Sequence, residues 1–185
     1  MNHPEKWKYD AAYEIETYRM GPKRVAAANE WIGSLDPDGR SYLDVGTGRG
    51  ETLDWAERRG MLVQGTELVT ELCDGERIIY AEMESLPFDD HAFDYVSTFD
   101  VVEHLLPENT QQCLDELFRV TKRELCISTN DRPSRLPDGT DLHINIRSRD
   151  EWENDLVERV NARGGKIFFS TFGLAQHDWM WRIEL

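Results

Sequence analysis

Apolar and polar positions alternate between strand and helix patterns along most of the chain. Short apolar runs bounded by turn residues predict strands at 41–45, 61–65, 77–81, 93–98, 124–128, 166–171 and 178–185. Apolar residues at helical spacing predict helices at 22–35, 51–59, 108–122 and 149–163, after an aromatic, partly helical lead-in over 5–18. In the helix over 149–163 we expect the inward-facing residues to be Trp152, Leu156, Val157 and Val160.

The order of these elements predicts an α/β fold. Strands alternating with helices are typical of a doubly wound (Rossmann-like), mostly parallel sheet, here with seven strands. Only residues 172–177 join the last two strands, which is too short for a helical crossover, so the C-terminal strand should form an antiparallel hairpin. About ten residues separate Glu67 from the third strand, so the usual helix there must be shortened or lost. We expect one domain over 1–185, with a helical cap at 1–38 and a long polar loop at 130–147.

Composition and net charge limit the kinds of molecule that the protein is expected to bind. The chain has 185 residues, 39% hydrophobic and 31% charged, as in soluble globular proteins. Its net charge of -15 makes nucleic-acid binding unlikely, because phosphate backbones attract basic surfaces. Three scattered cysteines, a polar N-terminus and the lack of a long apolar run favour a cytoplasmic protein without membrane insertion. The one candidate basic cluster comprises Arg132, Arg135, Arg147 and Arg149.

A glycine-rich turn over 44–50, Asp-Val-Gly-Thr-Gly-Arg-Gly, links the first strand to a helix. Backbone amides at such a helix start can bind a polar or anionic ligand group. The spacing is GxGxG rather than the dinucleotide pattern GxGxxG, which suits a nucleoside without a pyrophosphate. The alternatives are a plain tight turn and, on the fold alone, a nicotinamide dinucleotide enzyme.

Glu67 ends the second predicted strand, about 20 residues after the turn. A carboxylate at that position can accept hydrogen bonds from both hydroxyls of a ribose. The alternative is a solvated acid at a strand end.

Further residues complete a family pattern. Residues 86–88 are Leu-Pro-Phe, 93–96 are Phe-Asp-Tyr-Val and 103–105 are Glu-His-Leu. Together with the glycine turn and Glu67, they resemble the class I S-adenosylmethionine-dependent methyltransferases over about residues 40–130. The likeness is greatest to the branch of ubiquinone/menaquinone-biosynthesis methyltransferases.

The resemblance implies that S-adenosylmethionine is the cofactor and assigns residues to its parts. Glu82 and Met83 replace the residues commoner in the family, so we expect the contact with the adenine to be rearranged. The methionine part would lie among Asp44, Gly46, Thr47, Gly48 and Gly50, the ribose at Glu67, the adenine among Leu68, Glu82 and Met83, and the sulfonium beside Phe99 and Asp100.

The sequence indicates less about the residues that would bind the methyl acceptor. His104 is a candidate general base, although a structural histidine opening a helix explains it as well. Tyr18 and His143 are candidate substrate contacts. A metal site from His143 and Asp141 would lack a third ligand, so no metal is predicted.

The aromatic residues of the lead-in, Tyr9, Tyr13 and Tyr18, could form a lid over the cofactor, or serve core packing or a partner surface. The implied activity is methyl transfer to a small-molecule acceptor by in-line attack on the sulfonium methyl. The alternatives are a macromolecular acceptor and a non-catalytic protein that binds S-adenosylmethionine.

Overall fold

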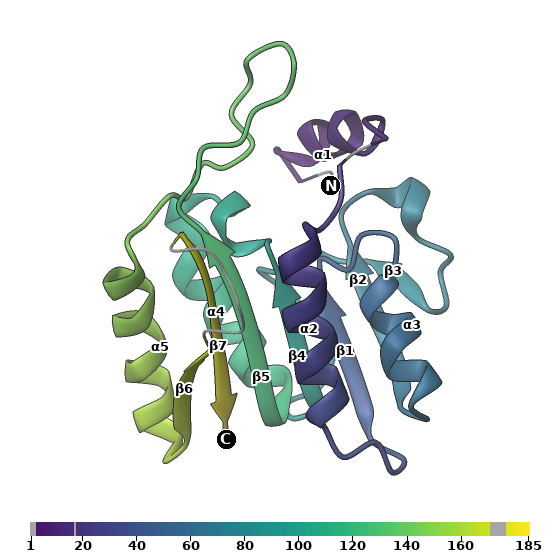
Figure 1. The fold of residues 1–185 in the computed structure, drawn as a ribbon, viewed down its shortest axis with the longest axis vertical. Helices are drawn as coiled ribbons and strands as arrows, with labels where there is room; N and C mark the ends of the chain where they lie inside the picture. The colour runs from purple at the N-terminus through teal and green to yellow at the C-terminus, as the bar shows by residue number, and fades with distance from the viewer. Residues whose placement is uncertain (1–2, 17, 171–176) are drawn as a thin grey trace.

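A computed structural model describes residues 3–16, 18–170 and 177–185 (Figure 1). The helices are α1 (Lys6–Tyr13), α2 (Pro22–Ser34), α3 (Glu51–Arg58), α4 (Thr110–Val120) and α5 (Arg149–Arg163). The strands are β1 (Ser41–Val45), β2 (Leu62–Glu67), β3 (Ile78–Tyr80), β4 (Phe93–Phe99), β5 (Thr121–Asn130), β6 (Lys166–Ser170) and β7 (Asp178–Glu184). Short 3-10 helices lie at Thr70–Leu72, Val102–His104 and Pro107–Asn109.

Within the described residues the strands form a seven-stranded sheet in the order β3-β2-β1-β4-β5-β7-β6. The pairs from β3 to β5 are parallel, whereas β7 runs antiparallel to both β5 and β6. This confirms the predicted doubly wound sheet and its antiparallel C-terminal strand. Most of the link expected at 172–177 lies outside the described residues. The strand order reverses between β1 and β4, and ligand crevices in such sheets open at the carboxyl ends of the strands there.

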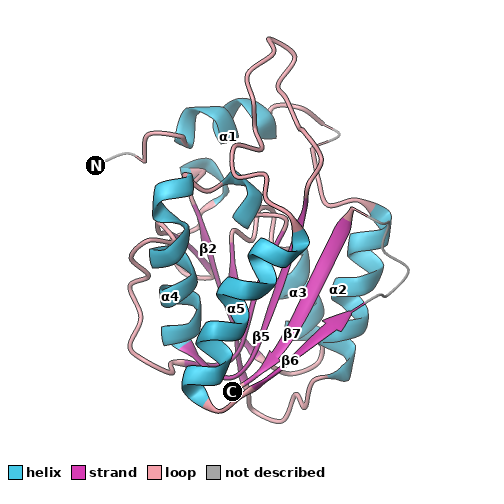
Figure 2. Ribbon diagram, turned by 90° about the vertical axis from the view of Figure 1, so that its left-hand side faces the viewer, coloured by secondary structure: helices cyan, strands magenta, loops and turns pink. Residues whose placement is uncertain are grey.

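Helices cover both faces of the sheet. Figure 2 shows α4 and α5 lying together on one side, and their apolar residues form one core cluster with Leu43, Leu125 and Ile127. On the other face α2 and α3 pack with Tyr42 and Cys126. Neighbouring residues of β1 and β5 thus enter opposite layers, as the two-residue repeat of a strand requires.

Helix α5 has the predicted bounds because both of its ends are specified locally. Ser148 and Glu151 form a reciprocal capping box at its start, and Gly164 ends it with a φ of 66°. Trp152, Leu156 and Val160 recur every four residues and are buried. The prediction that Val157 faces inward is wrong: it is 38% exposed, because it lies one residue beyond that apolar stripe.

The junction of α4 and β5 differs from the prediction. The helix ends at Val120 instead of Lys122, and β5 begins at Thr121 rather than residue 124. The Thr121 hydroxyl donates to the carbonyl of Leu117 at 2.6 Å, and the Thr121 backbone pairs with Phe93 of β4. Pairing with β4, which the local pattern does not encode, extends the strand toward the helix.

Between β2 and β3 the structure contains only the 3-10 helix Thr70–Leu72, in agreement with the expected loss of a full helix. Of the segment predicted as a cap, α1 lies at the end of the molecule toward which the parallel strands point, whereas α2 packs on the sheet (Figure 1). Among the described helices, none combines the length and apolar character needed to cross a membrane.

Candidate functional site

A cavity of about 370 Å³ lies at the carboxyl ends of the parallel strands. That volume falls within the usual range for small-molecule sites, about 300–1,000 Å³. The predicted residues that line it are Tyr18, Gly46, Thr47, Gly48, Glu67, Leu68, Met83, Phe99, Asp100, His104 and His143. Three predicted residues, Asp44, Gly50 and Glu82, are not part of its lining.

The glycine turn forms one wall of the cavity. The backbone N–H groups of Gly46 and Thr47 both donate to the carbonyl of Thr66, at 2.9 and 3.0 Å, which ties the turn to β2. Gly46 has a φ of 75°, and a Cβ atom there would lie 2.6 Å from a methyl carbon of Val101. A side chain at this position would therefore be both strained and obstructed.

Asp44 lies beneath the turn rather than in the cavity. Its carboxylate accepts hydrogen bonds from the hydroxyls of Ser97, at 2.5 Å, and Thr52. Burial raises the pKa of Asp44 to about 6, although these hydroxyls partly offset the rise. The residue thus supports the turn from behind. Gly50, the residue before α3, donates its N–H to the carbonyl of Thr47 at 3.0 Å within the turn.

Glu67 is buried at the end of β2 and binds the turn directly. Its Oε2 accepts from the N–H of Gly48 at 2.8 Å, and its Oε1 accepts from Leu68 at 2.8 Å and Val69 at 3.2 Å. Burial raises its pKa, and these three N–H groups oppose the rise. A carboxylate has about four acceptor sites, so one remains free. Glu67 can accept one further hydroxyl as it stands; a second would require release of Gly48.

Next to Glu67, the cavity wall differs from the expectation. Leu68 and Met83 line it, but Glu82 accepts a hydrogen bond from the Tyr80 hydroxyl at 2.9 Å and stays outside. The acid that reaches the cavity is Glu84, which accepts from Asn109 Nδ2 at 2.9 Å. Hydrogen bonding, first of all to His3, lowers the pKa of Glu84 to about 2.

Asp100 follows β4 in a left-handed conformation, with a φ of 55°. Its Oδ1 pairs with Nε of Arg24 at 2.9 Å. Arg24, in α2, is 4% exposed and also donates to the carbonyls of Thr129 and Trp179, both at 3.0 Å. Sequence reasoning missed this arginine; its position four residues before the buried Ala28, on the apolar side of the helix, was the available signal.

His104 is 9% exposed and lies against His143, with ring centroids 4.6 Å apart. Its Nδ1 is 3.0 Å from the carbonyl of Leu142, so Nδ1–H donates and Nε2 keeps its lone pair. Burial lowers the pKa of His104 to about 3, which leaves the ring neutral and a weak base. Its role as a general base stays a prediction. Asp141 lies elsewhere and pairs with Arg135 at 2.6 Å.

Glu103 is a second residue that the sequence did not single out. It is fully buried, and its carboxylate accepts from Asn130 Nδ2 at 2.7 Å and Thr129 Oγ1 at 2.9 Å. Burial, and then the charge of Asp100, raise its pKa well above the usual range. The Glu-His-Leu pattern over 103–105 pointed to this segment, but it did not indicate that the side chain of Glu103 is buried.

The N-terminal tyrosines Tyr9, Tyr13 and Tyr18 all line the cavity. The rings of Tyr13 and Tyr18 meet edge to face at 5.1 Å, and the Tyr9 hydroxyl donates to the carbonyl of His104 at 3.2 Å. Arg49 of the glycine turn donates to the carbonyl of Tyr13 at 3.2 Å. The lead-in is therefore held against both the turn and the segment after β4.

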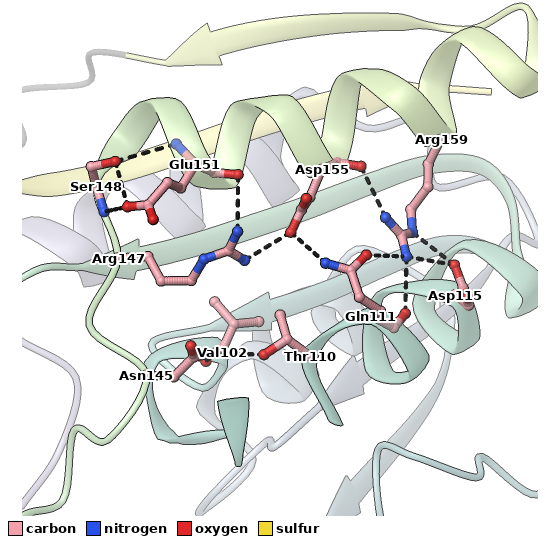
Figure 3. A network of polar contacts seen from close by, with 10 residues as sticks. All are labelled: Val102, Thr110, Gln111, Asp115, Asn145, Arg147, Ser148, Glu151, Asp155 and Arg159. Carbon is pink, nitrogen blue, oxygen red and sulfur yellow. Dashed lines mark hydrogen bonds and ion pairs between the residues drawn. The ribbon is translucent and has the colours of Figure 1, made fainter. Parts of the chain in front are cut away.

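The loop between β5 and α5 is anchored where it leaves the cavity (Figure 3). Asn145 Nδ2 donates to the carbonyl of Val102 at 3.1 Å and to Thr110 Oγ1 at 2.9 Å. Beyond it, Arg147 pairs with Asp155 of α5 at 2.8 Å. These contacts fix the backbone two residues after His143.

Acidic residues outnumber basic ones around the cavity. Its lining contains the carboxylates of Glu51, Glu67, Glu84 and Asp100 and the guanidinium groups of Arg19 and Arg49. The surroundings therefore favour a ligand with positive charge.

Residues 43–124 match a family model described as a methyltransferase domain. The matched segment carries the glycine turn, Glu67, Asp100 and His104. This segment is similar to methyltransferase domains. This confirms the prediction of a methyltransferase. No curated protein matches the sequence of this methyltransferase.

Solved structures of several methyltransferases share the fold. An S-adenosylmethionine-dependent methyltransferase from Mesorhizobium loti superposes with a TM-score of 0.67 at 14% identity, over 89% of this chain and 99% of that one. Magnesium protoporphyrin IX methyltransferase from Synechocystis PCC 6803, with bound S-adenosylmethionine, gives 0.64 at 15% identity, over 96% and 90%. Phosphoethanolamine N-methyltransferase 2 from Haemonchus contortus, also with S-adenosylmethionine, gives 0.66 at 14%, over 97% and 56%. The chain thus has the fold of these methyltransferases.

Proposed function

We propose that this methyltransferase transfers the methyl group of S-adenosylmethionine to a small-molecule acceptor bound in the same cavity. The observation that carries the proposal is the joining of Glu67 to the glycine turn through Gly48, at the wall of a cavity of about 370 Å³. S-adenosylmethionine is the cofactor, and it supplies an electrophilic methyl group on a sulfonium sulfur. The finer resemblance to the ubiquinone/menaquinone branch stays a prediction.

The residues around the cavity fit that cofactor. Glu67 keeps one free acceptor site for a ribose hydroxyl, and Leu68 and Met83 offer apolar contacts for the adenine. Thr47 adds a hydroxyl to the lining, which a polar group of the ligand could contact. Asp100, paired with Arg24, adds a carboxylate to the lining.

A small acceptor suits the shape and charge of the site. The N-terminal tyrosines and the loop carrying His143 both contribute to its walls. The net charge of -15 disfavours an approaching nucleic acid. The acceptors named for the two relatives above, magnesium protoporphyrin IX and phosphoethanolamine, are also small molecules.

Catalysis in this proposal depends on position. The chain's residues would hold the acceptor in line with the methyl group and exclude water. Orientation alone can contribute about 7–11 kcal/mol to the rate. Phe99 and His104, which line the cavity, would set that line of approach.

Two measurements test the proposal. Calorimetry with S-adenosylmethionine and S-adenosylhomocysteine should show saturable binding of both. Transfer of a labelled methyl group should then be screened across hydroxylated, amino and thiol acceptors. A folded sample that binds neither ligand at about millimolar concentration refutes the cofactor assignment. Binding with no transfer to any acceptor would favour the non-catalytic alternative.

A further inference from the structure

Three side chains of metal-ligating type meet beside the cavity, and two of them, His104 and His143, line it. Glu103, His104 and His143 each offer one ligand atom, and these atoms all lie within 4.8 Å of one another. Glu103 and His104 belong to the 3-10 helix after β4, and His143 comes from the loop after β5. About 40 residues of sequence separate them, so the fold itself assembles the group.

Both histidines have the neutral tautomer that leaves Nε2 free to bind a metal ion. Nδ1 of His104 faces the carbonyl of Leu142 at 3.0 Å, and Nδ1 of His143 faces the carbonyl of Arg132 at 2.5 Å. A carbonyl can only accept, so each Nδ1 carries the proton and each Nε2 keeps a lone pair. Histidines that bind metal ions usually donate their other nitrogen to such an oxygen, which fixes the tautomer and the ring.

The Glu103 carboxyl group has no cationic partner among the described residues. It accepts hydrogen bonds from two neutral donors, Asn130 Nδ2 at 2.7 Å and Thr129 Oγ1 at 2.9 Å. The nearby buried cation, Arg24, pairs with Asp100 instead. The oxygens of Glu103 therefore keep lone pairs for a further ligand.

Backbone hydrogen bonds between the loop after β5 and the 3-10 helix after β4 hold the three residues close together. The N–H groups of Ile144 and Asn145 donate to the carbonyl of Glu103 at 3.1 and 2.9 Å. This bonding places the backbone of His143 directly beside the backbone of Glu103. His143 is half-buried and lines the cavity, so an ion bound beside it would be open to the cavity.

We propose that Glu103, His104 and His143 bind one divalent transition-metal ion, whose open coordination positions take an oxygen of the methyl acceptor. Two imidazoles and one carboxylate suit ions such as Zn²⁺, Mn²⁺ or Fe²⁺. Ligand atoms at about 2.1 Å from an ion must approach one another to about 3–3.5 Å, which small side-chain rotations provide. The site would select acceptors with a hydroxyl or carboxylate oxygen. That selection rests on the proposed function, whereas metal binding itself does not.

Metal binding can be measured without turnover. The full-length protein, freed of metal by chelation, would be titrated with Co²⁺ and followed by visible absorption, with Mn²⁺ and Zn²⁺ as competitors. We expect one saturable site. His143→Ala should weaken it by at least about 10- to 100-fold, the loss that even an outer partner of a metal ligand causes. Glu103→Gln, which keeps the shape of the side chain, is the second variant.

His91→Asn is the matched control. His91 lies before β4, at the opposite end of the strand from the cavity, and its φ of 55° is one that asparagine tolerates. Its Co²⁺ affinity should equal that of the wild type. The inference is overturned if the wild type shows no saturable site, or if both His143→Ala and Glu103→Gln bind Co²⁺ as the wild type does.

Calorimetry with S-adenosylhomocysteine on the same samples separates the two proposals. If S-adenosylhomocysteine binds and Co²⁺ does not, the metal site is refuted and the proposed function stands. If Co²⁺ binds and S-adenosylhomocysteine does not, the metal site stands, but its assignment to a methyl acceptor fails together with the proposed function.

Discussion

Replacing Glu67 by glutamine separates its role in the cofactor site from any role in folding. The carboxylate accepts three backbone hydrogen bonds, from Gly48, Leu68 and Val69. In Glu67→Gln the remaining carbonyl oxygen can still accept from Leu68 and Val69. The new amide NH₂ group then faces the N–H of Gly48. Both groups are donors, so the hydrogen bond between residue 67 and the glycine turn is lost.

The magnitude follows from the bond that a ribose hydroxyl should donate to Glu67. A hydrogen bond to a charged group contributes about 1.5–3 kcal/mol. Loss of that bond in the misaligned amide corresponds to a cofactor affinity lower by about 10- to 150-fold. Folding stability should change little, because burial opposes the charge of Glu67, as its raised pKa indicates, and the substitution removes that cost.

Calorimetry with S-adenosylhomocysteine and urea unfolding of the same samples would measure both quantities. Glu57→Gln, an equivalent change on an exposed side chain of α3, is the control and should leave both unchanged. If Glu67→Gln bound S-adenosylhomocysteine within twofold of the wild type, the assigned role of Glu67 would be refuted.

Three further predictions concern the same end of the molecule. Asp44, whose pKa is raised to about 6, favours folding most below its unfolded pKa and loses that contribution as the pH rises through 6. The stability gained by Asp44→Asn should therefore be about 2.4 kcal/mol larger at pH 8 than at pH 4 in urea unfolding, and equal gains would contradict the pKa shift. Asn145→Ala should cost about 1–3 kcal/mol of unfolding free energy, because it leaves the buried Val102 carbonyl and Thr110 hydroxyl without their donor. Gly48→Ala should lower the affinity for S-adenosylhomocysteine measured by calorimetry, since its Cβ would lie 2.5 Å from a tyrosine hydroxyl of the N-terminal lead-in; an unchanged affinity would show that the lead-in gives way freely.

The strands and α5 could be predicted because their signals are local. Apolar runs end at glycine turns, and the ends of α5 are marked by Ser148 and Gly164. The early start of β5 at Thr121 and the exposure of Val157 could not, since each depends on which neighbouring element packs there.

The residues expected to bind the cofactor could be predicted from the sequence for a similar reason. Its turn and Glu67 lie within about 20 residues and face one crevice. The choice between Glu82 and Glu84 depends on the path of the segment after β3, which the sequence pattern leaves open. The meeting of Glu103 with His143, and of Arg24 with Asp100, joins parts of the chain that are distant in sequence. Side-chain type alone does not predict such encounters.

The excess of carboxylates around the cavity bears on how the enzyme handles its spent cofactor. S-adenosylmethionine carries a net charge of +1 and S-adenosylhomocysteine none, because the sulfonium becomes a thioether. The field of Glu51, Glu67, Glu84 and Asp100 therefore attracts the fresh cofactor more strongly than the used one. Glu67 is buried, so salt screens its part of that field weakly. The acidic lining should thus limit product inhibition, an effect of the cavity walls rather than of any catalytic group.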